Sequence, residues 1–533
     1  MGLFISVEMT IECVVAAILI SALLCATYVR FLGILQTAGY SNKKLFEWAG
    51  KKNNSAIPRL VLLFMLCALS HGVMALCFSF AGKWAAVAAL AAYPLFLILY
   101  AVADKKAALR SPVSFTPRLK RLYVVAFFIT AVLVYFSITL LNFADYLWQN
   151  QIFNLLRYLP LAVFTLLPLP IIALSNLVAK IYEVPHNKSF VRAAKRKMGG
   201  ANLTVVGITG SYGKTSTKQI LSSILSKKYR VLSTPRSHNT PMGLALCINS
   251  NDLANYDIFI AEMGARHVGD IAELCAFCPP DYSIITGICP QHLESFKTEE
   301  NIIKAKGEIL LGTKNTAVIA PDCYESFEAY ACNKIAADCI SDIVCLNSGT
   351  EFVLTLGGES KKVKTKLLGA HSAQNIALAA QLAHELGMSL AEIAEAVEGL
   401  EFIEHRLQLI TNNGVNILDD GYNSNVKGAA AALEVLRTFE GRKIAVTPGL
   451  VELGILEESE NYALGKKLVC LDEVILVGDT LIAPVKKGYL ENGGDKQKLH
   501  VVPTLFAAQD MLKGILQGGD TVLFLNDLPD IYC

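Results

Sequence analysis

The sequence has almost no surplus of charge of either sign. Its 48 lysine and arginine residues nearly balance 46 aspartate and glutamate residues, so the formal net charge of the 533-residue chain is only +2. Proteins that bind nucleic acids without strong selectivity usually carry a large positive excess. The composition therefore argues against a general nucleic-acid-binding protein, and we expect no nucleic-acid partner.

The 14 cysteines lack the spacing of a disulfide framework. Four of them lie in long apolar runs, and Cys275 with Cys278 forms a single CxxC that has no second pair nearby. Scattered thiols are typical of a reducing cytoplasm and a membrane, and not of a secreted disulfide-bonded domain. We interpret Cys275 and Cys278 as small apolar positions of a helix.

Ionisable residues are scarce in five apolar runs of about 20 residues, the length that crosses a hydrocarbon core of about 30 Å. These runs raise the mean hydropathy of the whole chain to +0.43. They predict about five transmembrane helices, with four or six left open because prolines interrupt the last run. Charged transport paths are not expected in such apolar segments. The runs are Ile11–Val29, Leu60–Phe80, Trp84–Val102, Leu122–Leu141 and Leu159–Val178.

Basic residues between the runs predict the orientation of the chain. Six lie in each of the segments 30–59, 105–121 and 180–197, whereas the alternate loops contain only Lys83 and Arg157. The first run also lacks the basic start of a signal peptide, so we expect it to be retained. By the positive-inside rule, the N-terminus is outside and the chain after residue 180 is cytoplasmic. We expect a multi-pass protein of the cell (plasma or inner) membrane, with the lipid bilayer as a partner.

The chain after about residue 186 has the pattern of an α/β protein. Apolar strand-like runs alternate with helical segments, which indicates parallel sheets covered by helices. We expect three domains: a transmembrane domain at 1–185, a central ATP-binding domain at 186–400 and a Rossmann-like domain at 401–533. The predicted strands are Leu203–Ile208, Asp257–Glu262, Tyr282–Ile288, Thr316–Ala320, Val415–Leu418, Lys443–Val446, Glu473–Val477 and Thr521–Leu525.

A glycine-containing turn follows the first of these strands. Residues 209–213 read Thr-Gly-Ser-Tyr-Gly, and Lys214-Thr215-Ser216 begins an amphipathic helix. A strand, a glycine turn and a helix N-terminus together place free N–H groups and the positive end of a helix dipole at one point. Lys214 supplies a charge for β/γ-phosphates and Thr215 a hydroxyl for Mg²⁺. Since Ile208 occupies the first glycine position of the strict Walker spacing, we predict a variant phosphate loop.

The stretch 209–215, TGSYGKT, resembles the TGxxGKT loop of the Mur ligases, the ATP-dependent amide ligases of peptidoglycan synthesis. The resemblance covers roughly residues 195–530, and the most similar branch adds D-alanyl-D-alanine to the muramoyl tripeptide. Further stretches resemble motifs of the family in the same order: 237–243 (SHNTPMG), 261–265 (AEMGA), 291–294 with 304–308 (QHLE and KAKGE), 369–375 (GAHSAQN), Arg406 with 419–425 (DDGYNSN), and 451–454 (VELG).

The resemblance implies that ATP and Mg²⁺ convert a substrate carboxylate into an acyl phosphate, which an amine then attacks. The resemblance implies that Thr215 and Glu262 ligate one Mg²⁺ and that His292 helps to hold a second. Implied catalytic residues are Lys214, His292, Lys306 and Asp420. Implied nucleotide-binding residues are Gly210, Ser211, Gly213, Lys214, Thr215, Ser216, Asn375, Arg406, Asp420 and Asn423.

Lys306 matches the family's carbamylated lysine, 14 residues after His292. Lys304 is the other candidate for this role, and an unmodified lysine that forms a salt bridge is the alternative reading. His238 and His267 are more readily interpreted as ordinary polar residues than as ligands. A loop-capping role and a functional role are equally compatible with Glu452.

The chain also departs from the family. The N-terminal domain that grips the UDP moiety has no counterpart, and the apolar runs occupy its place. Ser372 and Gly287 replace family asparagines, and residues 447–450 and 525–528 differ from the family's glycine-methionine and KGS segments. These departures leave the ATP motifs intact. They bear on which carboxylate and which amine the protein uses as substrates.

We therefore expect a membrane-anchored ligase acting on a cell-wall peptide precursor and an amino acid or D-alanyl-D-alanine. Two alternatives remain: a Mur-type ligase that extends a peptide polymer outside the wall, and a non-catalytic membrane scaffold. An ATP-driven transporter would need polar residues along the apolar runs, where they are scarce.

Overall fold

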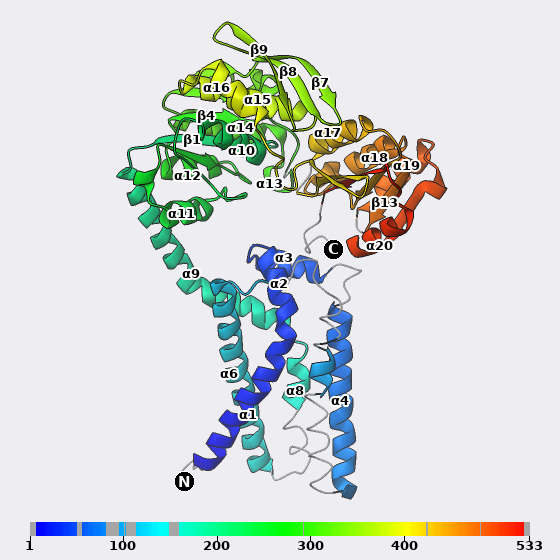
Figure 1. Cartoon of the computed structure of the whole chain (residues 1–533). Coiled ribbons are helices and arrows are strands. Elements are labelled where there is room, and N and C mark those ends of the chain that lie inside the picture. The colour runs from blue at the N-terminus through cyan, green and yellow to red at the C-terminus, as the bar shows by residue number, and fades with distance from the viewer. Residues whose placement is uncertain are drawn as a thin grey trace. The chain divides into compact units, whose positions relative to one another are not determined.

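A computed structural model describes residues 7–50, 56–81, 95–100, 102, 113–148, 159–291, 293–422, 425–479 and 481–526. These residues form two compact units, one up to His186 and the other from Asn187 onward. Figure 1 shows that the first unit is helical and that the second contains β-sheets covered by helices.

The described residues of the first unit are mainly helical. Residues 95–100 are helical. The other helical elements are α1 (Val7–Cys25), η1 (Ala26–Tyr28), α2 (Val29–Thr37), α3 (Asn42–Ala49), α4 (Ala56–Ala81), α6 (Pro117–Trp148), α8 (Leu159–Phe164) and α9 (Pro168–Gly199).

Two of the described helical segments, Cys13–Thr37 and Pro117–Leu140, are long and apolar enough to cross a membrane. Only 22% of the apolar window in Pro117–Leu140 is buried, so most of this helix faces away from the protein interior. The structure thus supports two candidate spans where about five were predicted. The predicted run Trp84–Val102 lies largely outside the described residues. The predicted run Leu60–Phe80 falls within the 26-residue helix α4, whose side chains are described only as far as Ser70.

The predicted run Leu159–Val178 is not one helix. α8 ends at Phe164 and α9 begins at Pro168, with a turn between them. Proline has no N–H and its ring clashes with the preceding turn of a helix, so Pro168 and Pro170 fit only the first turn of a new helix. The interruption therefore follows directly from the prolines.

The second unit contains a parallel sheet in the order β2-β3-β1-β4-β5-β6. β1 lies between β3 and β4, so the chain leaves β1 toward one side of the sheet and later returns to its other side. Ligands of open α/β sheets bind at such switch points, beyond the carboxyl ends of the strands. The strands are β1 (Thr204–Thr209), β2 (Val231–Ser233), β3 (Ile258–Glu262), β4 (Tyr282–Ile285), β5 (Thr316–Ile319) and β6 (Asn333–Ala336).

Helices and one end of α9 complete this part of the second unit. Ala194 and Met198 of α9 belong to its hydrophobic core. The helices that follow β1 in the chain are α10 (Lys214–Leu225), α11 (Pro241–Ser250), α12 (Asp270–Phe277), α13 (Leu293–Phe296), α14 (Glu299–Gly312), α15 (Ala370–Glu385) and α16 (Leu390–Glu398).

A small antiparallel sheet, β7-β8-β9, was not predicted. It comprises β7 (Ile340–Leu346), β8 (Gly349–Leu356) and β9 (Glu359–Thr365). In β9 only Val363 and Thr365 are buried, because one face of the strand is open to solvent and is largely charged. A strand with so few apolar residues gives a weak alternating pattern, which explains why the sequence did not reveal it.

The last sheet has the order β10-β11-β15-β12-β13-β14, with β10 antiparallel to β11 and the other neighbours parallel. Its strands are β10 (Gln408–Asn412), β11 (Val415–Asp420), β12 (Lys443–Thr447), β13 (Glu473–Val477), β14 (Leu499–Val502) and β15 (Thr521–Leu525). Its helices are α17 (Val426–Arg437), α18 (Glu457–Leu468), α19 (Ile482–Glu491) and α20 (Leu505–Ile515). All eight predicted strands are present in the two parallel sheets.

Glycines allow α18 and α19 to pack at very short range. A Cβ atom at Gly465 would collide with the carbonyl oxygen of Val485, and one at Gly488 would collide with that of Tyr462. Both obstacles are backbone atoms, which cannot move aside without shifting a helix. By contrast, a Cβ at Gly514 in α20 would meet nothing within 4 Å.

We predict that Gly488→Ala lowers the free energy of unfolding by about 2 kcal/mol or more, because overpacking forces the two helices apart. The matched variant Gly514→Ala should raise it by up to about 1 kcal/mol, since alanine is the better helix former. Denaturant unfolding of the two variants in parallel measures both effects. Equal stability of the two variants would contradict the close packing of α18 and α19.

Candidate active site

The phosphate loop, residues 210–213, connects β1 to α10. Gly210 and Gly213 have φ angles of 148° and 75°, which favour glycine. A Cβ at Gly210 would collide with Thr286, and one at Gly213 would lie 2.6 Å from Asn375 Oδ1. No side chain caps the start of α10, so the first N–H groups of the helix are left for another acceptor. Such a helix N-terminus suits a phosphate.

Lys214 folds back over this loop. Its Nζ donates hydrogen bonds to the carbonyl oxygens of Gly210 (2.7 Å) and Ser211 (3.2 Å). Burial lowers the pKa of Lys214, and nearby Arg406 lowers it further, whereas Glu262 raises it. The charged form is therefore destabilised here, and an anion bound to the loop would stabilise it.

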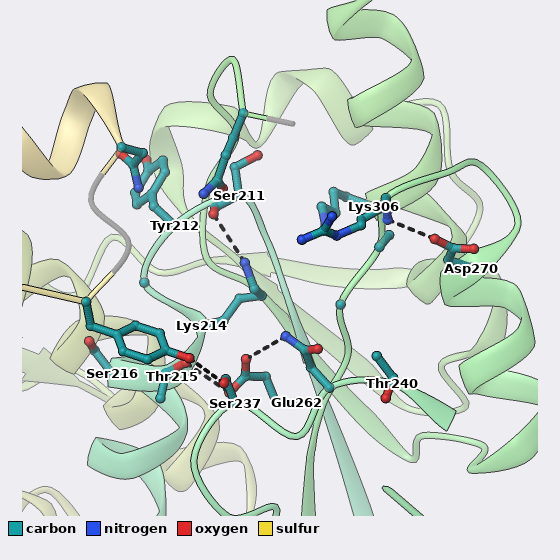
Figure 2. Close-up of a pocket in the computed structure, with 18 of the residues that line it drawn as sticks. Ser211, Tyr212, Lys214, Thr215, Ser216, Ser237, Thr240, Glu262, Asp270 and Lys306 are labelled. Atoms are coloured by element: carbon teal, nitrogen blue, oxygen red, sulfur yellow. Dashed lines mark hydrogen bonds between the residues drawn. The ribbon is translucent and has the colours of Figure 1, made fainter. Parts of the chain in front are cut away.

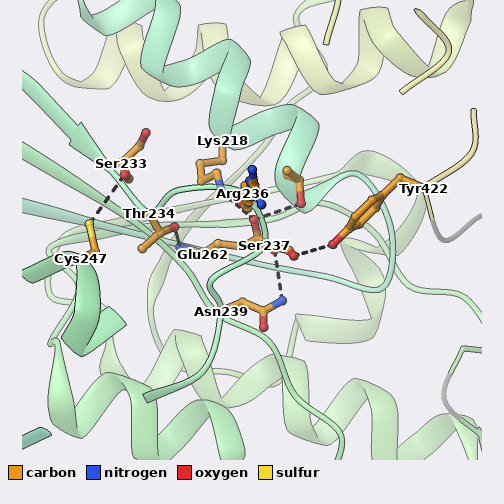
Figure 3. A network of polar contacts seen from close by, with 10 residues as sticks. Lys218, Ser233, Thr234, Arg236, Ser237, Asn239, Cys247, Glu262 and Tyr422 are labelled. Carbon is orange, nitrogen blue, oxygen red and sulfur yellow. Dashed lines mark hydrogen bonds and ion pairs between the residues drawn. The ribbon is translucent and has the colours of Figure 1, made fainter. Parts of the chain in front are cut away.

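Glu262, at the end of β3, lies in a buried polar cluster (Figure 3). Its Oε2 accepts hydrogen bonds from Thr215 Oγ1 (3.1 Å) and Lys218 Nζ (3.0 Å). Its Oε1 accepts one from Asn239 Nδ2 (3.2 Å). The side chains of Glu262 and Lys218 are each only 1% exposed. Sequence analysis missed Lys218, although its position one helical turn after Lys214 places it on the same face of α10.

The oxygens of Thr215 and Glu262 fit the implied Mg²⁺ ion. They lie side by side at the mouth of the phosphate loop, and Mg²⁺ commonly takes one or two protein oxygens together with phosphate oxygens and water. Among the described residues no cluster of three or more His, Cys, Asp or Glu side chains was found. His292, the third implied ligand, lies outside the described residues.

A cavity of about 450 Å³ opens in front of the loop (Figure 2). Its walls bring together Lys214, Thr215, Glu262, Lys306 and Arg406, which the sequence separates by up to 192 positions (406 − 214). Gly213, Ser211 and Ser216 also line it. The predicted phosphate, metal and carboxylate-activating groups therefore share one space.

Lys306 is the buried candidate of the two lysines proposed for carbamylation. It is 3% exposed and lines the cavity, whereas Lys304 is exposed on α14. Burial, followed by the charge of Lys214, lowers the pKa of Lys306 well below its usual value. A neutral amine is the form that can react with CO₂, so this environment suits a carbamate.

A second cavity of about 640 Å³ shares Tyr212, Gly213 and Ser216 with the first. It is lined by Asn375 and His371 of α15 and by Asp420 at the end of β11. Asn375 Oδ1 accepts a hydrogen bond from Thr217 Oγ1 (3.2 Å). His371 Nδ1 is buried without a hydrogen-bond partner among the described residues, and burial lowers the pKa of His371 to about 4. Neutral, unsatisfied polar groups of this kind suit a purine base.

Arg406 and Tyr422 line both cavities. Arg406 Nη1 donates to the Tyr422 carbonyl oxygen (3.0 Å), and the guanidinium lies 4.4 Å from the centroid of the Tyr422 ring. The Tyr422 hydroxyl in turn contacts Ser237 Oγ, which joins the two α/β parts of the unit (Figure 3). Burial raises the pKa of Asp420 to about 7, with Arg406 opposing the rise. Asn423 lies outside the described residues.

The residues on both sides of Arg406 have left-handed backbones. His405 has φ 58° and Leu407 has φ 48°, which is costly for side chains other than glycine. Each is held by a carboxylate of β11: His405 Nδ1 lies 2.7 Å from Asp419 Oδ2, and the Leu407 N–H donates to Asp420 Oδ1 (3.2 Å). Sequence analysis predicted Arg406 as a nucleotide-binding residue, but it gave no sign that Asp419 and Asp420 hold the residues on both sides of it.

Four further residues that the sequence analysis singled out are described by the structure. His267 lines the smaller cavity, and Glu452 reaches it indirectly through an ion pair with Arg266 at 3.5 Å. Cys275 lies in α12 and Cys278 directly follows it, and both are buried free thiols.

Comparison with known proteins decides the family. Residues 208–383 match the Mur ligase middle domain, and residues 405–526 match the Mur ligase glutamate ligase domain. The UDP-N-acetylmuramoyl-tripeptide--D-alanyl-D-alanine ligase of Escherichia coli (strain K12) is 31% identical over 337 residues, which cover 59% of this chain and 74% of the relative. The chain belongs to the Mur ligase family. The enzyme of the same description from Bacillus subtilis (strain 168) is 29% identical over 348 residues, covering 62% and 74% of the two chains.

Solved structures of Mur ligases share the fold. MurF from Thermotoga maritima, in complex with ADP, has a TM-score of 0.58 and 28% identity, and the match covers 65% of this chain and 81% of that one. MurF from Acinetobacter baumannii has a TM-score of 0.59 and 25% identity, with 65% and 78% covered. As a Mur ligase, the protein is an ATP-dependent ligase that forms carbon–nitrogen bonds and uses Mg²⁺.

In a Mur ligase the cavity residues act mainly by charge and position. Bound Mg²⁺ would supply positive charge to phosphate and carboxylate oxygens. Lys214 and the N–H groups of the phosphate loop are placed where they would hold the β/γ-phosphates, and Arg406, which lines the same cavity, would add a second cation.

We predict that Lys306→Ala lowers kcat by about 100-fold, a typical loss when a preorganised charged group is removed from a phosphoryl-transfer site. Lys306→Arg keeps a cation but cannot form the carbamate, so it should be similarly impaired. The matched variant Lys304→Ala should retain parental activity because Lys304 is exposed. Nuclear magnetic resonance with ¹³C-labelled bicarbonate should detect the carbamate in the parent only. Full activity of Lys306→Arg would refute the carbamate.

Proposed function

We propose that this protein is a membrane-anchored Mur ligase that joins D-alanyl-D-alanine, or a related amine, to the carboxylate of a muramoyl peptide. The observation that carries the proposal is the single cavity shared by Lys214, Glu262, Lys306 and Arg406. These residues surround the place where a γ-phosphate and a carboxylate, two anions, have to meet.

In the proposed reaction a carboxylate oxygen attacks the γ-phosphorus of ATP, the bond to the β–γ bridging oxygen breaks, and ADP leaves. The amine nitrogen then attacks the acyl carbon. The bond between that carbon and the phosphate oxygen breaks, inorganic phosphate leaves, and the nitrogen loses a proton to give the amide. Both steps gather negative charge on phosphate oxygens, so cations at fixed positions lower both barriers.

The relatives support the choice of substrates. The similar curated proteins from several bacteria are D-alanyl-D-alanine ligases of the UDP-N-acetylmuramoyl tripeptide. The cavity adds Arg266, His267, Gln291 and Asp270 to the phosphate-binding residues, and these polar groups are available to a peptide carboxylate and an amine. Gln291 is buried, and its Oε1 has no hydrogen-bond partner among the described residues, which suits a donor on a substrate.

Apolar surface on the helical unit supports a membrane anchor. Exposed apolar side chains follow one another along the candidate spans and α4, where water would be unfavourable. A buried polar contact joins two of the helices: the Tyr28 hydroxyl lies 3.0 Å from Thr130 Oγ1. The exposed apolar residues include Val14, Val15, Ile18, Leu19, Leu23, Val61, Leu62, Met65, Leu69, Val124, Phe128, Val132, Phe136 and Leu140.

The proposed substrates are tested with the purified full-length protein in lipid nanodiscs. Phosphate release should require ATP, Mg²⁺, a UDP- or lipid-linked muramoyl tripeptide and D-alanyl-D-alanine together. Lys214→Ala should lower the rate by about 100-fold or more, because a charged phosphate contact is lost. Lys227→Ala, which removes an exposed lysine just beyond the same helix, is the matched control. Activity on a glutamate polymer but not on muramoyl peptides would contradict the wall assignment.

The proposed topology is tested with reporter fusions in cells. Fusions at Lys106 and Lys188 should report the cytoplasm, because basic residues gather around both positions, and a fusion at Gln149 should report the outside. A cytoplasmic signal at Gln149 would exclude the orientation predicted from the loop charges, and recovery of the unfused protein in the soluble fraction would exclude the anchor.

A further inference from the structure

Three side chains from separate elements meet at the edge of the phosphate loop. Tyr212 belongs to the loop, Asp322 to η3 (Pro321–Cys323) after β5, and Lys427 to the first turn of α17. The Tyr212 hydroxyl donates to Asp322 Oδ2 at 2.5 Å. Lys427 Nζ donates to the same Asp322 oxygen (2.8 Å) and to the Tyr212 hydroxyl (3.3 Å). Lys427 Nζ also lies 4.9 Å from the centroid of the Tyr212 ring.

Tyr212 and Asp322 are fixed to the first α/β part of the unit. Thr286 Oγ1 donates to the Tyr212 carbonyl oxygen, and the Tyr212 ring covers Gly287, where any Cβ would collide with it. Burial raises the pKa of Tyr212, and Asp322 raises it further, so the hydroxyl stays protonated and continues to donate. Lys427 is the member of the trio that comes from the other α/β part.

The trio also adjoins the nucleotide-binding space. Tyr212, Asp322 and Lys427 line the larger cavity beside Asn375, and Tyr212 lines the smaller one beside Lys214. Because Tyr212 lies between Ser211 and Gly213 in the chain, its backbone is part of the loop that faces phosphate. A displacement of its ring would therefore move donors of the phosphate site.

We propose that Lys427 is a positioning residue that links docking of the C-terminal domain to the shape of the phosphate loop, through Tyr212 and Asp322. When the domain carrying α17 docks, Lys427 holds the Tyr212 ring against Gly287 and Asp322, and the loop is kept in its phosphate-binding form. Nucleotide binding and docking then favour each other, as linkage requires. The inference rests on the ATP site and is independent of which peptide and amine the enzyme joins.

The ion pair between Lys427 and Asp322 is better suited to coupling domain docking with nucleotide binding than to stabilising the fold. The side chains of Lys427 and Asp322 are 49% and 44% exposed, and half-exposed ion pairs contribute little to folding. Loss of Lys427 should therefore leave the fold intact and change nucleotide affinity.

The first test compares Lys427→Met with Lys314→Met in the full-length protein in nanodiscs. Lys314 forms an ion pair of the same length, 2.8 Å, with Asp281 and lines neither cavity, so its loss controls for the loss of a surface charge pair. The dissociation constant of a fluorescent ADP analogue should rise about three- to tenfold in Lys427→Met and stay at the parental value in Lys314→Met. The KM for ATP should rise by a similar factor, with the KM for the amine unchanged.

The second test asks whether Lys427 acts through Tyr212. Tyr212→Phe keeps the ring and removes the hydroxyl, and the double variant with Lys427→Met completes a double-mutant cycle. If the trio works as one unit, the double variant should bind ADP little worse than Lys427→Met alone. Independent, multiplicative losses would overturn the link through Tyr212. Parental ADP affinity in Lys427→Met would overturn the role of Lys427, whereas absence of ligation with intact ADP binding would bear only on the proposed substrates.

Discussion

An excess of buried positive charge governs the active site of this ligase. Burial lowers the pKa of Lys214, Lys306 and Arg406; Arg406 lowers that of Lys214 further, and Lys214 lowers that of Lys306 further. Carboxylates oppose these shifts, but Glu262 is already engaged by Lys218 and Thr215. The desolvation of these cations is therefore offset only in part within the protein, and the phosphates of ATP with a substrate carboxylate can offset the rest. Binding of anions and closure around them follow from the same electrostatic imbalance.

Much of the catalytic part could be predicted from sequence, because its signals are local. The strand, glycine turn and lysine that form the phosphate site are contiguous, and the buried parallel strands are continuous apolar runs. Contacts made by tertiary structure left no such signal: Lys218 reads as an ordinary helical lysine, and Leu407 has a left-handed backbone that leucine rarely adopts. Hydropathy predicted the membrane runs, and the prolines of the last run left the number of helices open. The structure places the break between α8 and α9, where Pro168 begins α9.

Two departures from the family are explained by packing within the chain. Gly287 lies under the Tyr212 ring, so a side chain at position 287 is incompatible with a tyrosine in the phosphate loop. The two altered segments of the C-terminal domain are joined by a hydrogen bond, in which the buried Asn526 donates to the Gly449 carbonyl oxygen at 2.7 Å. Gly287 fits the Tyr212 ring, and the two altered segments of the C-terminal domain are spatial neighbours, so these differences concern internal fit.

The backbone around Arg406 has a consequence for how the domains move. Residues other than glycine have a narrow energy well in the left-handed region of backbone conformation. The backbones of His405 and Leu407 therefore have few alternative conformations. Because Asp419 and Asp420 bind these two residues to β11, the segment is held rigidly to the sheet and does not act as a hinge. We therefore expect Arg406 to move with the C-terminal sheet, so that opening of the domain would withdraw Arg406 and Asp420 together from the proposed nucleotide site, with little conformational entropy to lose when the domain closes again.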